Sequence, residues 1–166
     1  MRVTIVILAA GASKRLGYPK QLVVVEGETL LARAYRIASA VAPTIVVTRR
    51  ELAFGNALIN EHAEEGMASS IRLGVGACDG DVLLMTCDQP HVTSAHLRAL
   101  IEANAPIAAT AYADIAGVPA FFSARFRDEL LALRGDVGAR SVIERYRDAV
   151  VAIPLPEAEL DVDVPP

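Results

Sequence analysis

A loop of small residues near the start of the sequence is followed by cations, and this combination suits a polyanion. Residues 9–13 read Ala-Ala-Gly-Ala-Ser, so their backbone N–H groups can lie directly against a ligand. The cations that follow are Lys14, Arg15 and Lys20. Because exposed backbone donors beside positive charge bind phosphate groups, we expect a nucleoside triphosphate here.

Two of these cations could take part in chemistry. Lys20 follows Pro19, whose ring fixes one backbone angle, so the ammonium group can neutralise charge as a phosphoryl group is transferred. Arg15 carries a planar fork of donors that matches phosphate oxygens. The alternative for both residues is a solvated position on the surface, which is the usual place of lysine and arginine.

Asp88 is the strongest single candidate for metal binding. It follows the apolar run 81–86 and precedes a Gln-Pro pair, so it stands at the end of an expected buried strand. Mg²⁺ binds through one or two carboxylates together with phosphate oxygens, and Asp88 can supply the first carboxylate. Asp161 or Asp163 can supply the second if the tail folds back over the site. The alternatives are that Asp88 caps a turn and that the tail aspartates are solvated.

Residues 60–70 read Asn-Glu-His-Ala-Glu-Glu-Gly-Met-Ala-Ser-Ser, polar at first and small at the end. Exposed N–H groups and hydroxyls in this segment, from Asn60 to Ser70, can read the edge of a base. The alternative is that Ser69 or Ser70 simply caps a helix. The histidines are scattered along the chain, which argues against a histidine metal cluster. Cys87 is expected to be a small buried residue rather than a nucleophile, because the neighbouring carboxylate disfavours its thiolate.

Hydrophobic periodicity predicts the elements that must position these residues. Residues 3–8 are apolar and β-branched, as in a fully buried strand. Thr29 is expected to cap a helix, and residues 44–48 to form a second strand parallel to the first. Further strands are expected at 81–86, 107–110, 119–122 and 149–153, and further helices at 67–77, after Thr93, at 124–133 and at 136–147. Residues 52–59 fit either a helix or a short strand. In open α/β sheets ligands bind at the carboxyl ends of the strands, where Asp88 would stand.

Composition limits the class of protein. We expect the 166 residues, 1–166, to form one domain with a sizeable core. Hydrophobic residues make up 53% of the chain and aromatic residues 5%, which suits a mostly parallel sheet covered by helices on both faces. The net charge of −4 argues against nucleic acid as a partner, and no apolar run is long enough to cross a membrane. The two cysteines lack metal-binding spacing, which predicts a reducing, cytoplasmic location. The glycine fingerprint of dinucleotide-dependent oxidoreductases is absent.

Taken in order, these segments resemble the molybdenum cofactor cytidylyltransferase branch of the MobA-like nucleotidyltransferases. The resemblance is carried by L-A-A-G-A-S-K-R-L-G-Y-P-K-Q (8–21), N-E-H-A-E-E-G-M-A-S-S (60–70), C-D-Q-P (87–90), G-V-P-A-F-F (117–122), G-D-V-G-A-R (135–140) and D-V-D (161–163). The motifs follow the family's order along almost the whole chain. This sequence departs from the family in a shorter segment between Val47 and Asn60 and in its ending, D-V-D-V-P-P.

The resemblance implies a Rossmann-like, three-layer α/β/α fold with a mostly parallel sheet of the nucleotide-diphospho-sugar transferase type. It implies that the nucleotide is bound by Leu8, Ala9, Ala10, Gly11, Arg15, Lys20, Asn60, Ser70 and Asp88. Within this set it gives catalytic roles to Lys20, Arg15 and Asp88. It also places Ser70 near the cytosine edge, and it makes Asp88 and Asp163 the ligands of Mg²⁺.

The implied reaction transfers CMP from CTP, or a nucleoside monophosphate from another NTP, to the terminal phosphate of molybdopterin, with release of pyrophosphate. Mg²⁺ is the implied cofactor, and a molybdoenzyme that receives the cofactor is an implied partner. Two alternatives stay open. One is transfer to another phosphorylated small molecule, such as a sugar phosphate. The other is a nucleotide-binding cofactor chaperone without turnover.

Overall fold

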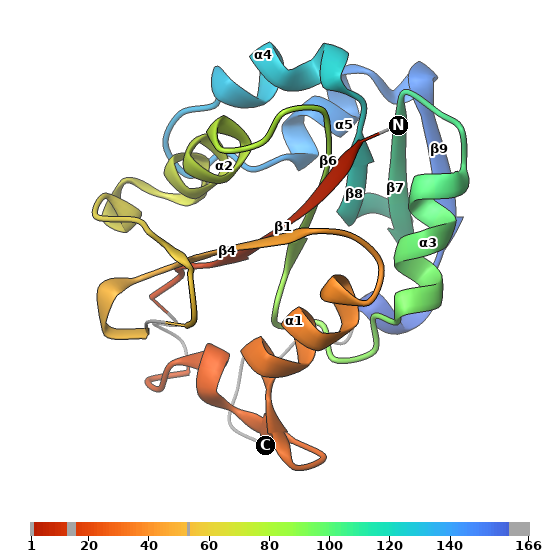
Figure 1. The fold of residues 1–166 in the computed structure, drawn as a ribbon. Coiled ribbons are helices and arrows are strands. Elements are labelled where there is room, and N and C mark those ends of the chain that lie inside the picture. Colours follow the sequence, from red (N-terminus) through yellow and green to blue (C-terminus); the bar gives the residue numbers. More distant parts are fainter. Residues whose placement is uncertain (1, 13–15, 53, 160–166) are drawn as a thin grey trace.

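The computed structural model describes residues 2–12, 16–52 and 54–159, and at its centre lies a mostly parallel β-sheet (Figure 1). Within these residues the sheet has seven strands in the order β5-β4-β1-β6-β8-β7-β9, and only β8 runs antiparallel to its neighbours. The strands are β1 Val3–Ala9, β4 Thr44–Thr48, β5 Leu58–Ile59, β6 Asp81–Thr86, β7 Ile107–Tyr112, β8 Ile115–Phe122 and β9 Val150–Pro154. The parallel pairing of β1 with β4 confirms the predicted βαβ unit.

Helices cover both faces of the sheet. One face packs against α1 (Leu30–Ser39) and α3 (Ser94–Glu102). The other face packs against α2 (Met67–Gly76), α4 (Arg127–Leu131) and α5 (Arg140–Arg145) (Figure 1). The predicted three-layer arrangement is therefore confirmed.

Strand β1 is apolar because it is covered on both sides. Ile5 and Ile7 belong to the core beneath α1 and α3, whereas Val6 and Leu8 belong to the core beneath α2 and α5. Successive residues of a strand point to opposite faces, so a central strand in a three-layer fold is mostly apolar on both faces, and in β1 Thr4 is the one polar residue. This burial makes the end of β1 a rigid support for the loop that follows it.

Two predicted helix caps are present. The hydroxyl of Thr29 accepts a hydrogen bond from the backbone N–H of Ala32 at 3.1 Å, at the start of α1. The hydroxyl of Thr93 does the same for the N–H of His96 at 3.1 Å, at the start of α3. Each hydroxyl satisfies a donor that the first turn of a helix leaves without a backbone partner.

The helices predicted in the last third of the chain were too long. Residues 135–138 form a loop, because Gly135 adopts a positive φ of 71°, and α5 begins only at Arg140. Residues 124–126 form a 3₁₀ turn before α4. Helical periodicity in these segments did not show where the regular helix ends, because short turns have a similar spacing of apolar residues.

One further segment differs from the sequence prediction, and the structure decides between the two alternatives left open for another. Strands β7 and β8 are longer than expected and form a hairpin, whose turn residues Ala113 and Asp114 have positive φ angles of 49° and 60°. The ambiguous segment 52–59 contributes the short strand β5, which pairs with β4 and follows a 3₁₀ turn at Arg50–Leu52. The strand alternative was therefore correct for Leu58–Ile59.

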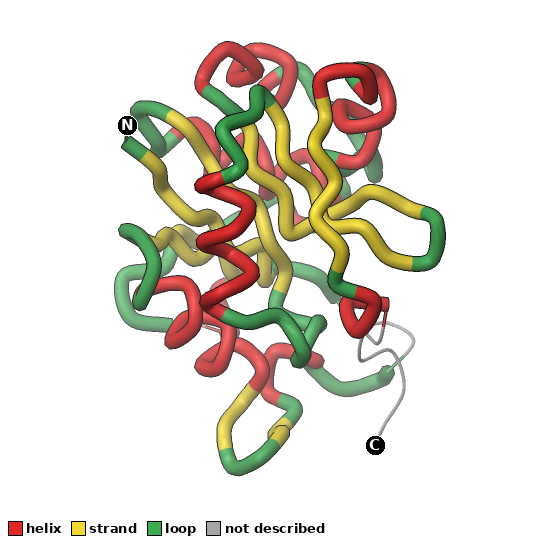
Figure 2. Tube along the Cα trace, turned by 90° about the vertical axis from the view of Figure 1, so that its right-hand side faces the viewer, coloured by secondary structure: helices red, strands yellow, loops and turns green. Residues whose placement is uncertain are grey.

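A small hairpin lies outside the main sheet. Its strands β2 (Val24–Val25) and β3 (Glu28–Thr29) pair antiparallel, and Figure 2 shows the hairpin protruding at one end of the molecule. The hairpin separates a 3₁₀ turn at Lys20–Leu22 from α1. The 3₁₀ turn and the hairpin therefore connect the loop after β1 to α1, which packs on the sheet.

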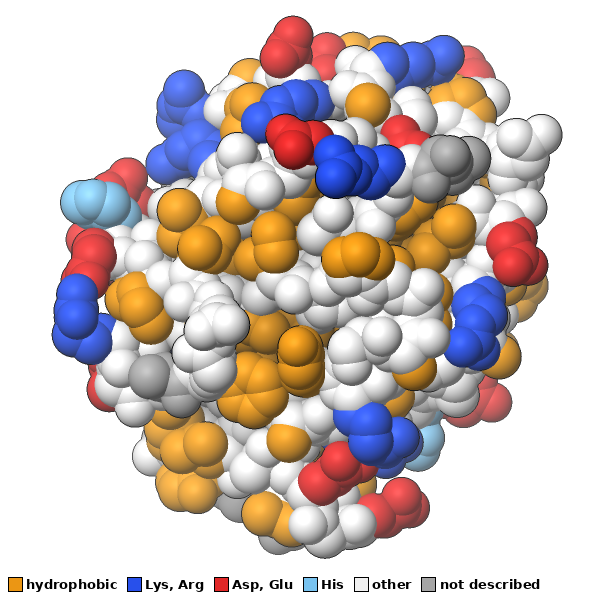
Figure 3. All heavy atoms as spheres, in the orientation of Figure 1, with side chains coloured by type: hydrophobic (Ala, Val, Ile, Leu, Met, Phe, Trp, Pro, Cys, Tyr) orange, Lys and Arg blue, Asp and Glu red, His pale blue; other side chains and the backbone are white. Residues whose placement is uncertain are grey.

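On the face shown in Figure 3, acidic and basic side chains are mixed around the rim, and no single basic patch dominates that face. In the part of the chain that the structure describes, no helix has the length and apolar character needed to cross a membrane.

Candidate functional site

The carboxyl end of β1 lies between those of β4 and β6. In the strand register Leu8 stands opposite Thr86 of β6, and Ala9 stands opposite Thr48 of β4. The chain runs on from Thr86 toward Asp88, and from Thr48 into Arg49. Segments far apart in the sequence therefore meet at one edge of the sheet, which is the edge where open α/β folds bind ligands.

The loop after β1 is fixed by a buried glutamine. Gln21 is 1% exposed, and its Nε2 donates hydrogen bonds to the carbonyl oxygens of Ala9 at 2.7 Å and Gly11 at 3.1 Å. Gln21 belongs to the 3₁₀ turn Lys20–Leu22, so these bonds also hold Lys20 close to the end of β1. At Gly11 a Cβ would have no described atom within 4 Å, so a ligand can approach the backbone there.

Asp88 is held on the β6 side of this loop. Its Oδ1 accepts a hydrogen bond from the hydroxyl of Thr86 at 2.6 Å, and its Oδ2 lies 3.3 Å from the Nζ of Lys20. Both side chains of the ion pair are 21% exposed, so water reaches them only in part. Arg33 fixes the same segment from α1 by donating from Nε to the carbonyl oxygen of Pro90 at 2.9 Å. The structure thus places two residues predicted from separate motifs in direct contact.

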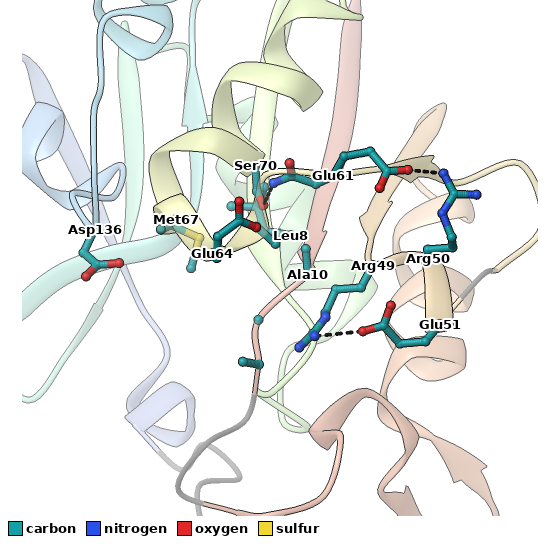
Figure 4. A pocket seen from close by; sticks show the side chains of 15 residues that line it. Leu8, Ala10, Arg49, Arg50, Glu51, Glu61, Glu64, Met67, Ser70 and Asp136 are labelled. Carbon is teal, nitrogen blue, oxygen red and sulfur yellow. Dashed lines mark hydrogen bonds and ion pairs between the residues drawn. The ribbon is translucent and has the colours of Figure 1, made fainter.

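On the β4 side of the β1 loop lies an open cavity of about 840 Å³ (Figure 4). The predicted site residues in its wall are Leu8, Ala10, Gly11, Asn60 and Ser70. The other lining residues are Ala12, Arg49, Arg50, Glu51, Glu61, Ala63, Glu64, Gly66, Met67 and Asp136. The β1 loop therefore separates a cavity on one side from the Lys20–Asp88 pair on the other.

Asn60 organises the start of α2 inside this cavity. Its Nδ2 donates to the hydroxyls of Ser69 and Ser70 at 2.9 Å each, and its Oδ1 accepts from the N–H of His62 at 2.9 Å. The hydroxyl of Ser69 donates in turn to the carbonyl oxygens of Gly66 and His62. The alternative of simple capping is not what the structure shows, because the N-cap of α2 is Gly66, which has no side chain. Asn60 and Ser70 are instead joined by a buried hydrogen bond in the cavity wall.

The charged residues of the cavity were not predicted from the sequence. Arg49 pairs with Glu51 at 2.8 Å, and Arg50 pairs with Glu61, as the dashed lines in Figure 4 show. Both arginines follow β4 directly, so the rule that singled out Asp88 after β6 also applies to them. Their position directly after a predicted strand could have identified them, but the segment that follows β4 could not be assigned to a helix or a strand from its sequence.

The start of α2 is also held by the loop before α5. The N–H of Ala68 donates to the carbonyl oxygen of Gly135 at 3.1 Å. Gly66 has a φ of +112°, and a Cβ there would overlap the carbonyl oxygen of Gly135 and the carboxylate of Asp136. The motif at 135–140 therefore lies against the motif at 60–70, and the contact requires a glycine.

We expect Gly66→Ala to destabilise the protein by more than about 1 kcal/mol, because alanine is strained at this φ and its Cβ has no room. If the cavity holds the nucleotide, the same change should also weaken nucleotide binding, since Gly66 lines it. Gly76, at the other end of α2, is the matched control, because a Cβ there meets no described atom within 4 Å. Urea unfolding and a nucleotide titration of both variants measure these effects. Equal stability of the two variants would contradict this description of the α2 start.

Cys87 does not have the environment of a nucleophile. Burial, and next the adjacent carboxylate of Asp88, raise the pKa of its thiol to about 12. The thiol is therefore protonated at neutral pH, as the sequence suggested. His96 is also buried, and burial lowers the pKa of its imidazole. Its Nε2 lies 2.9 Å from the hydroxyl of Thr110, within the core and away from the cavity lining.

The predicted site residues fall into three groups. Lys20 and Asp88 are in contact, and Ala9 is the last residue of β1, with its carbonyl oxygen bound by Gln21. Five others line the cavity, as given above. Arg15, Asp161 and Asp163 lie outside the described residues, so their predicted roles remain predictions.

The donor set at Asp88 fits a hard divalent cation. Asp88 offers one partly exposed carboxylate at the sheet edge, and Mg²⁺ typically uses one or two carboxylates with phosphate oxygens and water. His62, Glu64 and Glu65 form the one group of three potential ligand residues close enough to share an ion within residues 2–12, 16–52 and 54–159. All three are exposed, and Arg72 lies 3.8 Å from Glu65, so this group has the character of a solvated surface cluster.

Comparison with protein families gives a match over most of the chain. The model of the MobA-like NTP transferase domain matches residues 5–150. A probable molybdenum cofactor guanylyltransferase from Synechococcus elongatus is 30% identical over 110 residues, which cover 60% of this chain and 57% of that protein. The match with this curated relative therefore extends over less than two thirds of the relative's length.

Solved structures with a similar fold include Rv0371c from Mycobacterium tuberculosis H37Rv. Its crystal structure has a TM-score of 0.82 and 30% sequence identity, and the match covers 99% of this chain and 94% of that one. A crystal structure of Rv0371c in complex with manganese has a TM-score of 0.75 and 27% identity, with coverage of 94% of this chain and 89% of that one. The similarity thus extends over nearly all of both chains.

Proposed function

Because this chain belongs to the MobA-like NTP transferase family, we propose that it is a metal-dependent nucleotidyltransferase that acts on the molybdenum cofactor. The observation that carries the proposal is the contact between Lys20 and Asp88 beside the open backbone loop at the end of β1. A triphosphate requires backbone donors, a cation and a carboxylate that can hold a metal ion. The loop after β1, Lys20 and Asp88, which come from separate motifs, are the groups proposed for these roles. We also propose that residues 1–166 act as one nucleotidyltransferase domain.

The cavity and the ion pair suggest how the nucleotide lies. The base and ribose would occupy the cavity on the β4 side, where Asn60 and Ser70 form part of the wall. The triphosphate would cross the loop at Ala10 and Gly11 and reach Lys20 and Asp88 on the β6 side. Backbone N–H groups and the ammonium group of Lys20 would then neutralise the phosphate charge.

In this arrangement the reaction is a direct displacement at the α-phosphorus. A terminal phosphate oxygen of the acceptor forms a bond to the α-phosphorus, and the bond between the α-phosphorus and the bridging oxygen breaks, so that pyrophosphate leaves. Lys20 and Arg15 would stabilise the charge that develops on the phosphate oxygens. Catalysis would otherwise consist of holding the two substrates in line.

We propose that Asp88 holds the divalent cation together with Asp163. When bound, the cation would supply positive charge that neutralises the phosphates and helps to orient them. Support for Asp163 comes from the segment before it. The residues between β6 and α3, 87–93, form a loop that we call the Asp88 loop. The last described turn, Pro156–Glu159, is attached to it by a hydrogen bond from Gln89 to the carbonyl oxygen of Ala158 at 3.0 Å. The manganese complex of Rv0371c supports divalent metal binding in this fold.

We propose CTP as the nucleotide, on the resemblance of residues 60–70 and 87–90 to the cytidylyltransferase branch. GTP is the second candidate, because the Synechococcus relative bears the name of a guanylyltransferase. The proposed acceptor is molybdopterin, and a molybdoenzyme would then receive the product.

The test is a nucleotide panel with Mg²⁺ and a molybdopterin acceptor, in which binding and pyrophosphate release are read together. We expect pyrophosphate release with CTP, dependent on both metal and acceptor. Pyrophosphate release with GTP but not with CTP would indicate that the protein transfers GMP. Transfer only to a sugar phosphate would reject molybdopterin as the acceptor. Tight nucleotide binding without pyrophosphate release under any condition would favour a cofactor chaperone and overturn the proposed activity.

A further inference from the structure

The side chain of Gln89 connects three parts of the chain that are distant in sequence. Gln89 follows Asp88 directly, in the segment after β6. Its Nε2 donates to the carbonyl oxygen of Ala158 at 3.0 Å and to that of Val118, in β8, at 3.4 Å. One amide group therefore links the Asp88 loop to a sheet strand and to the last described turn of the chain.

The turn that Gln89 contacts is itself fixed to the sheet. The N–H of Leu155 donates to the carbonyl oxygen of Ala111 in β7 at 3.0 Å. The N–H of Ala158 donates to the carbonyl oxygen of Leu155 at 2.9 Å, and Ala158 is 1% exposed. The carbonyl of Ala158 is thus an ordered acceptor on a packed segment, and it can restrain the side chain that donates to it.

The orientation of the Gln89 amide is determined by its partners. Both acceptors are carbonyl oxygens, so the NH₂ end must face them and the Oε1 end must face away. Oε1 is buried, and no described group donates a hydrogen bond to it. An apolar side chain of similar size would avoid this unsatisfied acceptor, so packing alone does not account for glutamine here.

Because Gln89 and Asp88 are adjacent in the chain, contacts that hold Gln89 also limit the movement of the Asp88 backbone. The carbonyl oxygen of Gln89 accepts from the N–H of Val92 at 3.2 Å, so its backbone is held as well as its side chain. Asp88 is one peptide bond away, and its carboxylate is oriented by Thr86 at 2.6 Å, by Lys20 at 3.3 Å and by the position of this backbone. Groups that orient a metal ligand by hydrogen bonding to it typically change metal affinity when they are removed, and Gln89 would act on Asp88 one step further away, through the backbone.

We propose that Gln89 is a positioning residue, which ties the Asp88 loop to β8 and to the turn Pro156–Glu159 and so holds the Asp88 carboxylate in place for a divalent cation. The proposal rests on the proposed metal role of Asp88. It does not depend on whether Asp163 is the second ligand. Gln89 itself does not touch the reacting atoms.

The test compares Gln89→Met, which keeps the length of the side chain and loses both donors, with the wild-type protein. Mn²⁺ is titrated into the protein alone and followed by electron paramagnetic resonance. We expect the affinity for Mn²⁺ to fall by about 10-fold or more, the range typical of lost groups behind a metal ligand. We also expect faster amide hydrogen exchange in residues 155–159, since their link to the Asp88 loop is lost.

Kinetics separate positioning from chemistry. In Gln89→Met the metal concentration for half-maximal rate should rise by a similar factor, while kcat at saturating metal should stay within about twofold of the wild type. Gln89→Asn keeps the amide but is one methylene shorter, so it should show the same effects to a smaller degree, and it serves if the methionine variant does not fold. Ser94→Ala is the matched control, because it removes a side chain–backbone bond of 2.9 Å to Ile37 without touching the Asp88 loop.

Two results would overturn the positioning role. One is an unchanged Mn²⁺ affinity in a folded Gln89 variant, whatever the exchange rates. The other is the absence of Mn²⁺ binding in the wild type, because there would be no metal ligand to position. If the wild type binds Mn²⁺ but transfers no nucleotide, the proposed activity fails, while the affinity comparison still decides the role of Gln89.

Discussion

Asp88→Asn will abolish nucleotide-dependent pyrophosphate release, with a loss of at least about 10²–10³-fold in turnover. The amide of asparagine can still accept the hydrogen bond that Thr86 donates to Asp88 at 2.6 Å, so the loop keeps its shape. It cannot supply a charged oxygen ligand, and a hard cation binds a neutral amide oxygen in its place much more weakly. The change therefore removes the proposed metal ligand without removing the structure around it.

The Asp88→Asn protein should fold normally, with a free energy of unfolding close to that of the wild type. Its ion pair with Lys20 is 3.3 Å long and partly exposed, and such pairs typically contribute about 0–1 kcal/mol to stability. Turnover, Mn²⁺ affinity and urea unfolding are measured on one preparation. Asp79→Asn is the matched control, because Asp79 is 89% exposed and pairs only at the surface, with Arg2 at 3.7 Å. Unchanged turnover in a folded Asp88→Asn protein would rule out the metal role of Asp88.

Lys20→Ala will lower the rate by about 100-fold or more, the effect expected when a preorganised charge that stabilises a transition state is removed. Lys20 is placed for this role by its neighbour Gln21, which binds the carbonyl oxygens of Ala9 and Gly11. Because the contact would be stronger in the transition state than with bound substrate, kcat and kcat/KM should fall together.

The matched control for Lys20 is Arg98→Ala, which also removes a cation, but an exposed one, whose guanidinium donates to the carbonyl oxygen of Ala40, the C-cap of α1, at 3.2 Å. It should retain full activity. A Lys20→Ala protein with an unchanged kcat and a raised KM for nucleotide would show that Lys20 only binds the ground state. Wild-type kinetics in the Lys20→Ala protein would show that Lys20 takes no part in the reaction.

The regular parts of the fold could be predicted because their causes are local. Residues 3–8 are apolar at every position but Thr4, and residues 82–85 are apolar throughout, which identifies central strands of a covered sheet. Thr29 and Thr93 mark helix starts, because a threonine hydroxyl next to an apolar helical pattern is the usual N-cap. From parallel strands alone it follows that the segments after β1 and β6 share an edge.

Other features depend on contacts that no local pattern encodes. The late start of the helix predicted at 136–147 goes with the packing of residues 135–136 against Gly66, which is distant in sequence. The link from Gln89 to Ala158 likewise exists only in the folded chain. Arg49 and Arg50 were missed because their segment consists of a short turn and a two-residue strand, both below the length at which periodicity gives a signal.

The most direct test is a crystal structure of the protein with Mn²⁺ and the α,β-methylene analogue of CTP, whose α–β bond resists displacement. We predict that the triphosphate crosses the backbone at Ala10 and Gly11 with the base in the cavity beside Asn60. Anomalous density for manganese should lie within ligand distance of an Asp88 carboxylate oxygen. A nucleotide bound elsewhere, or a manganese ion between the phosphates with no contact to Asp88, would contradict the account.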